Sequence, residues 1–145
     1  MKQLITLTIC LFAFFGTTQA DEDRPIQVNE LPKKAQEFIK QYFSKNSISF
    51  AKVEKDFWDK NYDVVFVNGD KIEFNKNGTW ENIDCKYSEV PTAIIPKPII
   101  DYVTQHYPNT KVIQIERNKH GYEIELNNKI EIKFNLNFQV TEIDR

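Results

Sequence analysis

The stretch Gly121-Tyr122-Glu123-Ile124-Glu125-Leu126 alternates large apolar and charged side chains, and Ile130-Glu131-Ile132-Lys133-Phe134 does the same shortly afterwards. Successive side chains of a β-strand point to opposite faces, so a period of two predicts strands with one buried and one solvated face. These two stretches therefore predict neighbouring strands of a half-buried antiparallel sheet.

The same order of residues occurs earlier in the chain. Leu31-Pro32-Lys33 recurs as Ile95-Pro96-Lys97, and Tyr62, Phe74, Ile83 and Asp84 recur as Tyr122, Phe134, Ile143 and Asp144. Each proline precedes apolar residues at helical spacing, and proline is well tolerated at the first position of a helix. We therefore expect two helices, starting near Pro32 and Pro96, each followed by strands.

This duplication predicts an α+β fold of two tandem helix-plus-antiparallel-sheet repeats, because neither helix can bury its apolar face alone. The pattern leaves open whether the two copies share one sheet. The expected organisation is a tether or edge segment over 21–30, a first repeat over 31–84, a linker over 85–94 and a second repeat over 95–145. Strands are expected at 48–55, 62–67, 71–75, 79–84, 111–117, 121–126, 129–135 and 138–143.

The N-terminus has the pattern of a secretory signal. Lys2 precedes an apolar run over 4–15, and Thr18-Gln19-Ala20 supplies small residues for cleavage. The run is shorter than the roughly 20 residues that span a membrane. We therefore expect a signal peptide over 1–20, a periplasmic or secreted product, and no membrane span after cleavage. Cys85 is then the single cysteine, which excludes an internal disulfide.

Several segments resemble a known family. They are Leu31-Pro32 with Phe38-Ile39, residues 62–69 and 72–74, Ile95-Pro96, and residues 121–126 and 130–134. In order and spacing they are similar to the PepSY-like family of small exported bacterial proteins, over essentially the whole chain after the leader. The resemblance implies an architecture like that of the tandem-repeat β-lactamase inhibitor protein. It also implies a binding or inhibitory role, and it carries over no catalytic residue.

The residues that could support chemistry have simpler structural explanations. His106 ends a predicted helix and His120 lies in a turn, without the spacing of a zinc pair. Cys85 has no adjacent base or ligand. Residues 75–78 lack the carboxylates of a calcium loop and read as a hairpin turn. We therefore expect no catalytic, cofactor-binding or metal-binding residues, and no enzyme.

Charge patterning also limits the partners. The formal net charge is −2 with both signs interspersed, so no basic patch for nucleic acid is expected. The carboxylates on the solvated side of the predicted strands are expected to pair across strands with Lys129 and Lys133. These carboxylates are Glu123, Glu125, Glu131 and Glu142.

Four aromatic residues are the best candidates for partner binding: Phe57, Trp58, Trp80 and Tyr87. Phe57 and Trp58 lie in a predicted turn, where apolar bulk is unusual, and interfaces favour tryptophan and tyrosine. The alternative is that these rings fold back onto the core. The leading hypothesis is an exported binding or inhibitor-like module for an extracytoplasmic protein or peptide. The alternative is a carrier of a small ligand or envelope component in a cleft between the repeats, and the oligomeric state is open.

Overall fold

The computed structural model describes residues 23–145, and the predicted signal peptide over 1–20 lies outside them. The helices are α1 (Lys33–Tyr42), α2 (Lys97–His106) and a short 3-10 helix over Val28–Glu30. The strands are β1 (Arg24–Ile26), β2 (Ile48–Lys55), β3 (Lys60–Phe66), β4 (Lys71–Phe74), β5 (Trp80–Asp84), β6 (Val112–Asn118), β7 (Gly121–Leu126), β8 (Glu131–Asn135) and β9 (Val140–Asp144).

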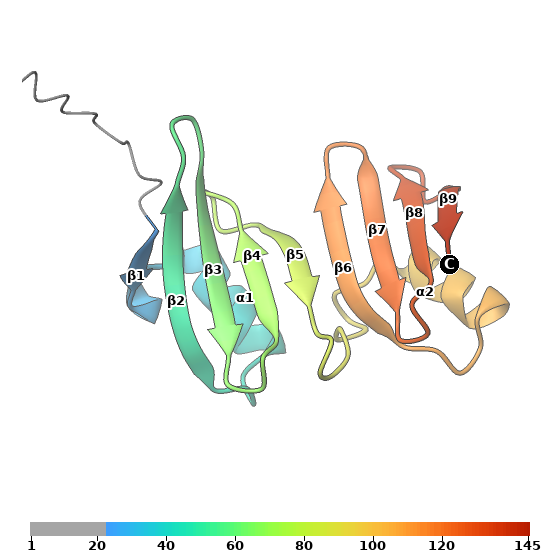
Figure 1. Ribbon diagram of the computed structural model, residues 1–145, viewed down its shortest axis with the longest axis horizontal. Helices are drawn as coiled ribbons and strands as arrows, with labels where there is room; N and C mark the ends of the chain where they lie inside the picture. Colours follow the sequence, from blue (N-terminus) through green and yellow to red (C-terminus); the bar gives the residue numbers. More distant parts are fainter. Residues whose placement is uncertain (1–22) are drawn as a thin grey trace, which may run out of the picture.

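The strands form one nine-stranded antiparallel sheet in sequence order, β1 to β9 (Figure 1). The expected α+β fold of two tandem helix-plus-sheet repeats is wrong, because residues 23–145 form mostly β-sheet, with two α-helices of only ten residues each. The boundaries at 31–84, 85–94 and 95–145 stay predictions.

The pairing of β5 with β6 makes the sheet continuous. Ile83 lies opposite Ile115, and Asp84 lies opposite Gln114. Arg117 adds a side-chain link across this junction, because its Nε donates to the carbonyl of Trp80 at 2.7 Å. An unpaired strand edge exposes backbone N–H and C=O groups, and joining the two edges satisfies both sets.

One row of apolar side chains crosses the inner face of the sheet from strand to strand. Its seven members from β2 to β8 are at most 2% exposed, whereas its last member, Ile143 on β9, is 40% exposed. The row consists of Ala51, Val64, Ile72, Ile83, Ile115, Ile124, Ile132 and Ile143. This row is the spine of the hydrophobic core.

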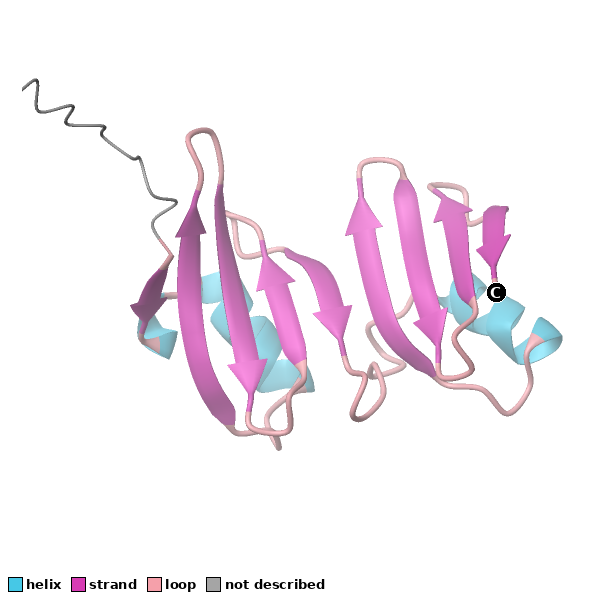
Figure 2. Ribbon diagram, in the orientation of Figure 1, coloured by secondary structure: helices cyan, strands magenta, loops and turns pink. Residues whose placement is uncertain are grey.

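Both helices cover the same inner face (Figure 2). α1 buries Ala35 and Ile39, and Phe38 meets the ring of Phe74 edge-on at 5.8 Å. α2 buries Ile99 and Val103 in the same way. Within residues 23–145, the opposite face of the sheet carries no helix, and it is called the open face below.

Two hairpin turns require backbone that glycine adopts most readily. Gly69 has φ +92° in the β3–β4 turn, whereas Lys129 adopts φ 68° in the β7–β8 turn. Similarly, Gly78 in the β4–β5 turn has φ +77°, and Phe138 in the β8–β9 turn has φ 59°. The turns in the second half of the chain therefore keep the same backbone geometry with non-glycine residues. Each left-handed non-glycine residue costs roughly 1–2 kcal/mol of conformational energy.

Candidate functional site

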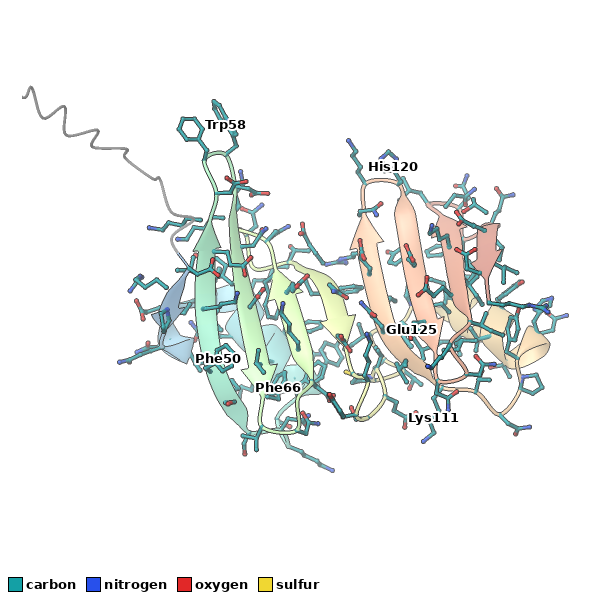
Figure 3. The ribbon with its side chains drawn as sticks, in the orientation of Figure 1. Phe50, Trp58, Phe66, Lys111, His120 and Glu125 are labelled. Carbon is teal, nitrogen blue, oxygen red and sulfur yellow. The ribbon has the colours of Figure 1, made fainter. Side chains whose placement is uncertain are left out.

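The most prominent feature of the surface is the tip of the β2–β3 hairpin. Phe57 is 71% exposed and Trp58 is 87% exposed, and Figure 3 shows Trp58 projecting beyond the end of the sheet. Their rings pack on each other edge-to-face, with centroids 4.8 Å apart. The pair, called the aromatic tip below, therefore presents a large apolar surface to solvent.

The backbone of the turn is held by its own polar groups. Asp56 Oδ1 accepts the Phe57 N–H at 2.7 Å, and Asp59 Oδ1 accepts the Lys60 N–H at 2.9 Å. The Asp56 N–H also donates to the Asp59 carbonyl at 3.0 Å. These carboxylates satisfy the turn without using the two rings, as expected of aspartate in turns. The aromatic side chains are thus not needed to close the hairpin.

The topologically similar β6–β7 hairpin has a different tip. Its connection consists of Lys119 and His120, both exposed, and His120 N–H donates to Asn118 Oδ1 at 2.8 Å. Figure 3 places His120 at the tip of that hairpin, on the same end of the sheet as Trp58. Apolar bulk at the tip is therefore specific to the first hairpin and is not a requirement of the fold.

An acidic hollow of about 470 Å³ lies at the base of the aromatic tip. It is open to solvent, and Asn61 Oδ1 is buried without a hydrogen-bond partner in the described structure. Its lining consists of Asp23, Glu54, Lys55, Asp56, Asp59 and Asn61. Four carboxylates and one lysine make this hollow electronegative.

A buried carboxylate, that of Asp63, lies farther along β3 than Asn61, on the open face of the sheet. Asp63 is 2% exposed, and its Oδ2 is 2.9 Å from Lys71 Nζ and 3.5 Å from Lys52 Nζ. Burial raises the pKa of Asp63 above its usual range, and Lys71 opposes that effect. Lys52 also pairs with Asp23 and Glu54, which links this cluster to the hollow.

The structure does not bring the four predicted partner-binding residues together. Trp80 is 7% exposed, with the Arg117 guanidinium 4.1 Å from its ring centroid. Tyr87 is exposed in the 85–94 connection, where its ring lies over Gly69 in the β3–β4 turn. That turn is at the opposite end of β3 from the aromatic tip (Figure 1). Phe57 and Trp58 therefore form the candidate site without Trp80 or Tyr87.

The thiol and the histidines lie on separate elements. Cys85 is fully buried, and burial raises its pKa to about 12. His106 stacks on Tyr102 with ring centroids 4.1 Å apart. His120 lies in the β6–β7 turn. Within residues 23–145, no group of three or more His, Cys, Asp or Glu side chains is placed to hold a metal ion.

The open face of β6–β9 is more acidic than charge pairing predicts. Lys133 does pair with Glu142, at 3.1 Å. However, Glu123 lies between Lys133 on β8 and Glu116 on β6, and Glu125 faces Glu131 on β8. Burial raises the pKa of Glu123, Lys133 opposes that effect, and Glu116 adds to it. Sequence reasoning missed these like-charged pairs because they depend on strand register.

Two comparisons with known proteins found relatives of this chain. A family model described as "Putative beta-lactamase-inhibitor-like, PepSY-like" matches residues 60–142. A structure described as a putative calcium-regulated periplasmic protein from Bacteroides thetaiotaomicron is 52% identical, with a TM-score of 0.84, covering 85% of this chain and 97% of that one. The comparison with curated proteins gave no match.

Two structures from Bacteroides vulgatus are also similar. One, described as a putative periplasmic protein of the DUF2874 family, is 53% identical, with a TM-score of 0.84, covering 87% of this chain and 99% of that one. The other, described as a putative periplasmic protein of unknown function, is 37% identical, with a TM-score of 0.80, and the coverages are 85% and 99%. These relatives confirm the predicted periplasmic or secreted location. No helix within residues 23–145 is long and apolar enough to cross a membrane.

Proposed function

The chain belongs to the PepSY-like family, and from that premise we propose that it is a non-enzymatic binding protein of the periplasm. It binds an extracytoplasmic protein by inserting its aromatic tip into an apolar pocket of that partner. The observation that carries this proposal is the exposure of Phe57 and Trp58 on a turn whose backbone is satisfied without them.

The energetics favour a binding role for these rings. A large aromatic side chain buries about 150–250 Å² when it enters a pocket, and about 25 cal/mol is gained per Å² of apolar area. Trp58 gains almost none of this in the isolated protein, because it is 87% exposed. Truncating a buried aromatic anchor typically costs about 2 kcal/mol or more, which is about 30-fold in Kd.

The test uses the purified protein, immobilised and exposed to a periplasmic extract. The double variant F57S/W58S is compared with wild type and with a control, H120S, at the tip of the β6–β7 hairpin. We expect a discrete protein that wild type and H120S retain and that F57S/W58S loses. The purified partner should then bind wild type at least about 30-fold more tightly than F57S/W58S. Equal retention by all three proteins would contradict the proposal.

The acidic hollow favours a second candidate function, which is regulation by calcium. One relative is described as calcium-regulated. Calcium prefers carboxylate and amide oxygens, and Asn61 Oδ1 in this hollow has no hydrogen-bond partner. The carboxylates of the hollow are not gathered into a ready-made cluster, so binding would require the turn to rearrange. Binding there would change the position of the aromatic tip, because Asp56 and Asp59 belong to both.

Terbium is a suitable probe for this second candidate, because tryptophan sensitises its luminescence at short range and Trp58 precedes Asp59 directly in the chain. We expect calcium to compete for the terbium signal, and we expect D56N/D59N to lose it. Asparagine keeps an oxygen that can accept the turn N–H groups, so the hairpin should stay intact. D101N on α2 is the control. A signal unchanged in D56N/D59N would place the ion elsewhere and refute this candidate.

A further inference from the structure

The last strand of the sheet leaves one apolar position incomplete. Within the described residues, β9 pairs with β8 and forms the final edge of the sheet. Ile143 ends the apolar row and is 40% exposed, whereas Ile132 beside it is fully buried. The backbone groups on the outer side of β9 lack a neighbouring strand. The backbone edge of β9 and the side chain of Ile143 thus leave room for one more strand, whose apolar residue would extend the row.

The β5–β6 junction shows how another strand fills such a place. Ile83 occupies on β5 the row position that Ile143 occupies on β9. Ile115 of β6 lies opposite Ile83, and Ile83 is fully buried. On the open face, Gln114 Nε2 donates to Asn82 Oδ1 at 3.1 Å. Side chains on both faces of β6 therefore make contacts with β5.

The charge around β9 selects the kind of strand that fits. Glu142 and Asp144 flank Ile143 and share the open face, and they interact closely enough that Glu142 raises the pKa of Asp144. Asp144 lies opposite a further carboxylate, Glu131 on β8. A strand opposite β9 would therefore place its open-face residues beside Asp144 and beside Glu142, which Lys133 of β8 contacts from the other side at 3.1 Å. Lysine or arginine stabilises those positions, and acidic residues destabilise them.

A second copy of this chain fits poorly on this edge. Two β9 strands paired with each other would bring Glu142 and Asp144 against their own kind. The other edge of the sheet is β1, whose central residue is Pro25, and proline lacks the N–H that strand pairing needs. Both observations favour a strand from a different protein over a strand from a second copy of this chain.

We propose that the β9 edge binds an extended peptide segment in which basic residues alternate with aliphatic ones, added as a tenth strand. An aliphatic side chain packs on Ile143, and the basic side chains on either side pair with Glu142 and Asp144. The β9 edge lies on the far side of the sheet from the β2–β3 hairpin that carries the aromatic tip, and it does not depend on that tip (Figure 1). Main-chain hydrogen bonds supply the affinity, and the alternating side chains supply the specificity.

The probe is a capped eight-residue peptide that alternates lysine with isoleucine. Binding is measured by calorimetry, and its location by amide chemical shifts and hydrogen exchange. We expect slower exchange of β9 amides, and an affinity that falls with salt. A peptide with glutamate in place of lysine should bind at least about tenfold more weakly. A lysine peptide N-methylated on the bonding edge should not bind, because it keeps the charge and loses the donors.

Variants locate the contact on the protein. E142K/D144K should weaken the lysine peptide about tenfold and strengthen the glutamate peptide. The control E37K/E81K makes the same change in net charge away from β9 and should bind the lysine peptide as wild type does. I143S should also weaken binding with the fold intact, because Ile143 is already partly exposed. If the N-methylated peptide bound as tightly as the unmethylated lysine peptide, charge attraction alone would explain the binding, and the proposal would be overturned. Light scattering that shows a dimer removed by E142K/D144K, or amide changes that avoid β9, would overturn it as well.

Discussion

Replacing Ile115 by alanine tests whether both halves of the sheet unfold as one unit. Ile115 lies at the centre of β6, is fully buried, and sits between Ile83 on β5 and Ile124 on β7. Isoleucine-to-alanine changes in cores cost about 2–5 kcal/mol. Since buried neighbours on both sides limit collapse into the cavity, we expect about 3–4 kcal/mol here. Domains of this size are stable by about 5–15 kcal/mol, so the variant should still fold.

Urea denaturation measures the effect with two signals. In a W58F background, Trp80 is the remaining tryptophan of the two in the sequence, and its fluorescence reports on β5. Circular dichroism reports on the whole sheet. With a slope of about 1.5 kcal/mol per molar urea, the I115A midpoint should fall by about 2 M in both signals.

The control is I143A, which changes the same residue type in the same row at the edge. Ile143 is 40% exposed, so we expect a loss of about 1 kcal/mol. Two separated transitions in I115A, with the Trp80 midpoint unshifted, would refute the reasoning. Equal losses in I115A and I143A would refute it as well.

Four further predictions concern single residues. G69A should destabilise the protein by about 1–2 kcal/mol in urea melts, because Gly69 has φ +92° and a Cβ there would lie 2.8 Å from the Tyr87 ring. K129G should instead stabilise the protein by about 0.5 kcal/mol, because glycine adopts the left-handed backbone of this position without strain but loses more entropy on folding than lysine does. If G69A and K129G changed the unfolding free energy in the same direction, this account would be contradicted. Cys85 should resist iodoacetamide at pH 8 in the native protein and react fully in urea, since the thiol is buried with a pKa raised to about 12. Rapid labelling of the native protein would show that the segment directly after β5 opens. Burial raises the pKa of Asp63 above 3.8, so native protein holds that proton more tightly than the unfolded chain, and the resulting stability is lost as pH rises through the native pKa. D63N carries no such proton, so its unfolding free energy relative to wild type should increase with pH above 3.8, and a difference independent of pH would refute this assignment.

Much of the local structure can be predicted from the sequence. The alternation over 121–126 and the proline-led apolar stripes specify β7, α1 and α2 to within a residue or two. The joining of the halves could not be predicted, because the residues of β5 and β6 alternate in the same way whether or not the two strands pair. The expected fold was wrong because it gave the helices too large a share of the structure, whereas most of the ordered elements are strands of one sheet. The pairing of Ile83 with Ile115 answers the question that the sequence left open.

The candidate site was predictable in part. Phe57 and Trp58 stand out because apolar residues in a turn have no core to face, and both are exposed. Trp80 was misleading for a geometric reason. Strict alternation from Ile83 would place Trp80 on the open face, but an irregularity in the β4–β5 pairing sets Trp80 opposite Phe74 and turns it inward.

The most direct measurement of the proposed function is site-specific photo-crosslinking in intact cells. A photoreactive phenylalanine analogue replaces Trp58 in one protein and His120, at the tip of the β6–β7 hairpin, in the other. The proposal predicts one discrete adduct with a second periplasmic protein from position 58 and no such adduct from position 120. The absence of an adduct at position 58, or the same adducts from both positions, would contradict the claim that the aromatic tip is the binding surface.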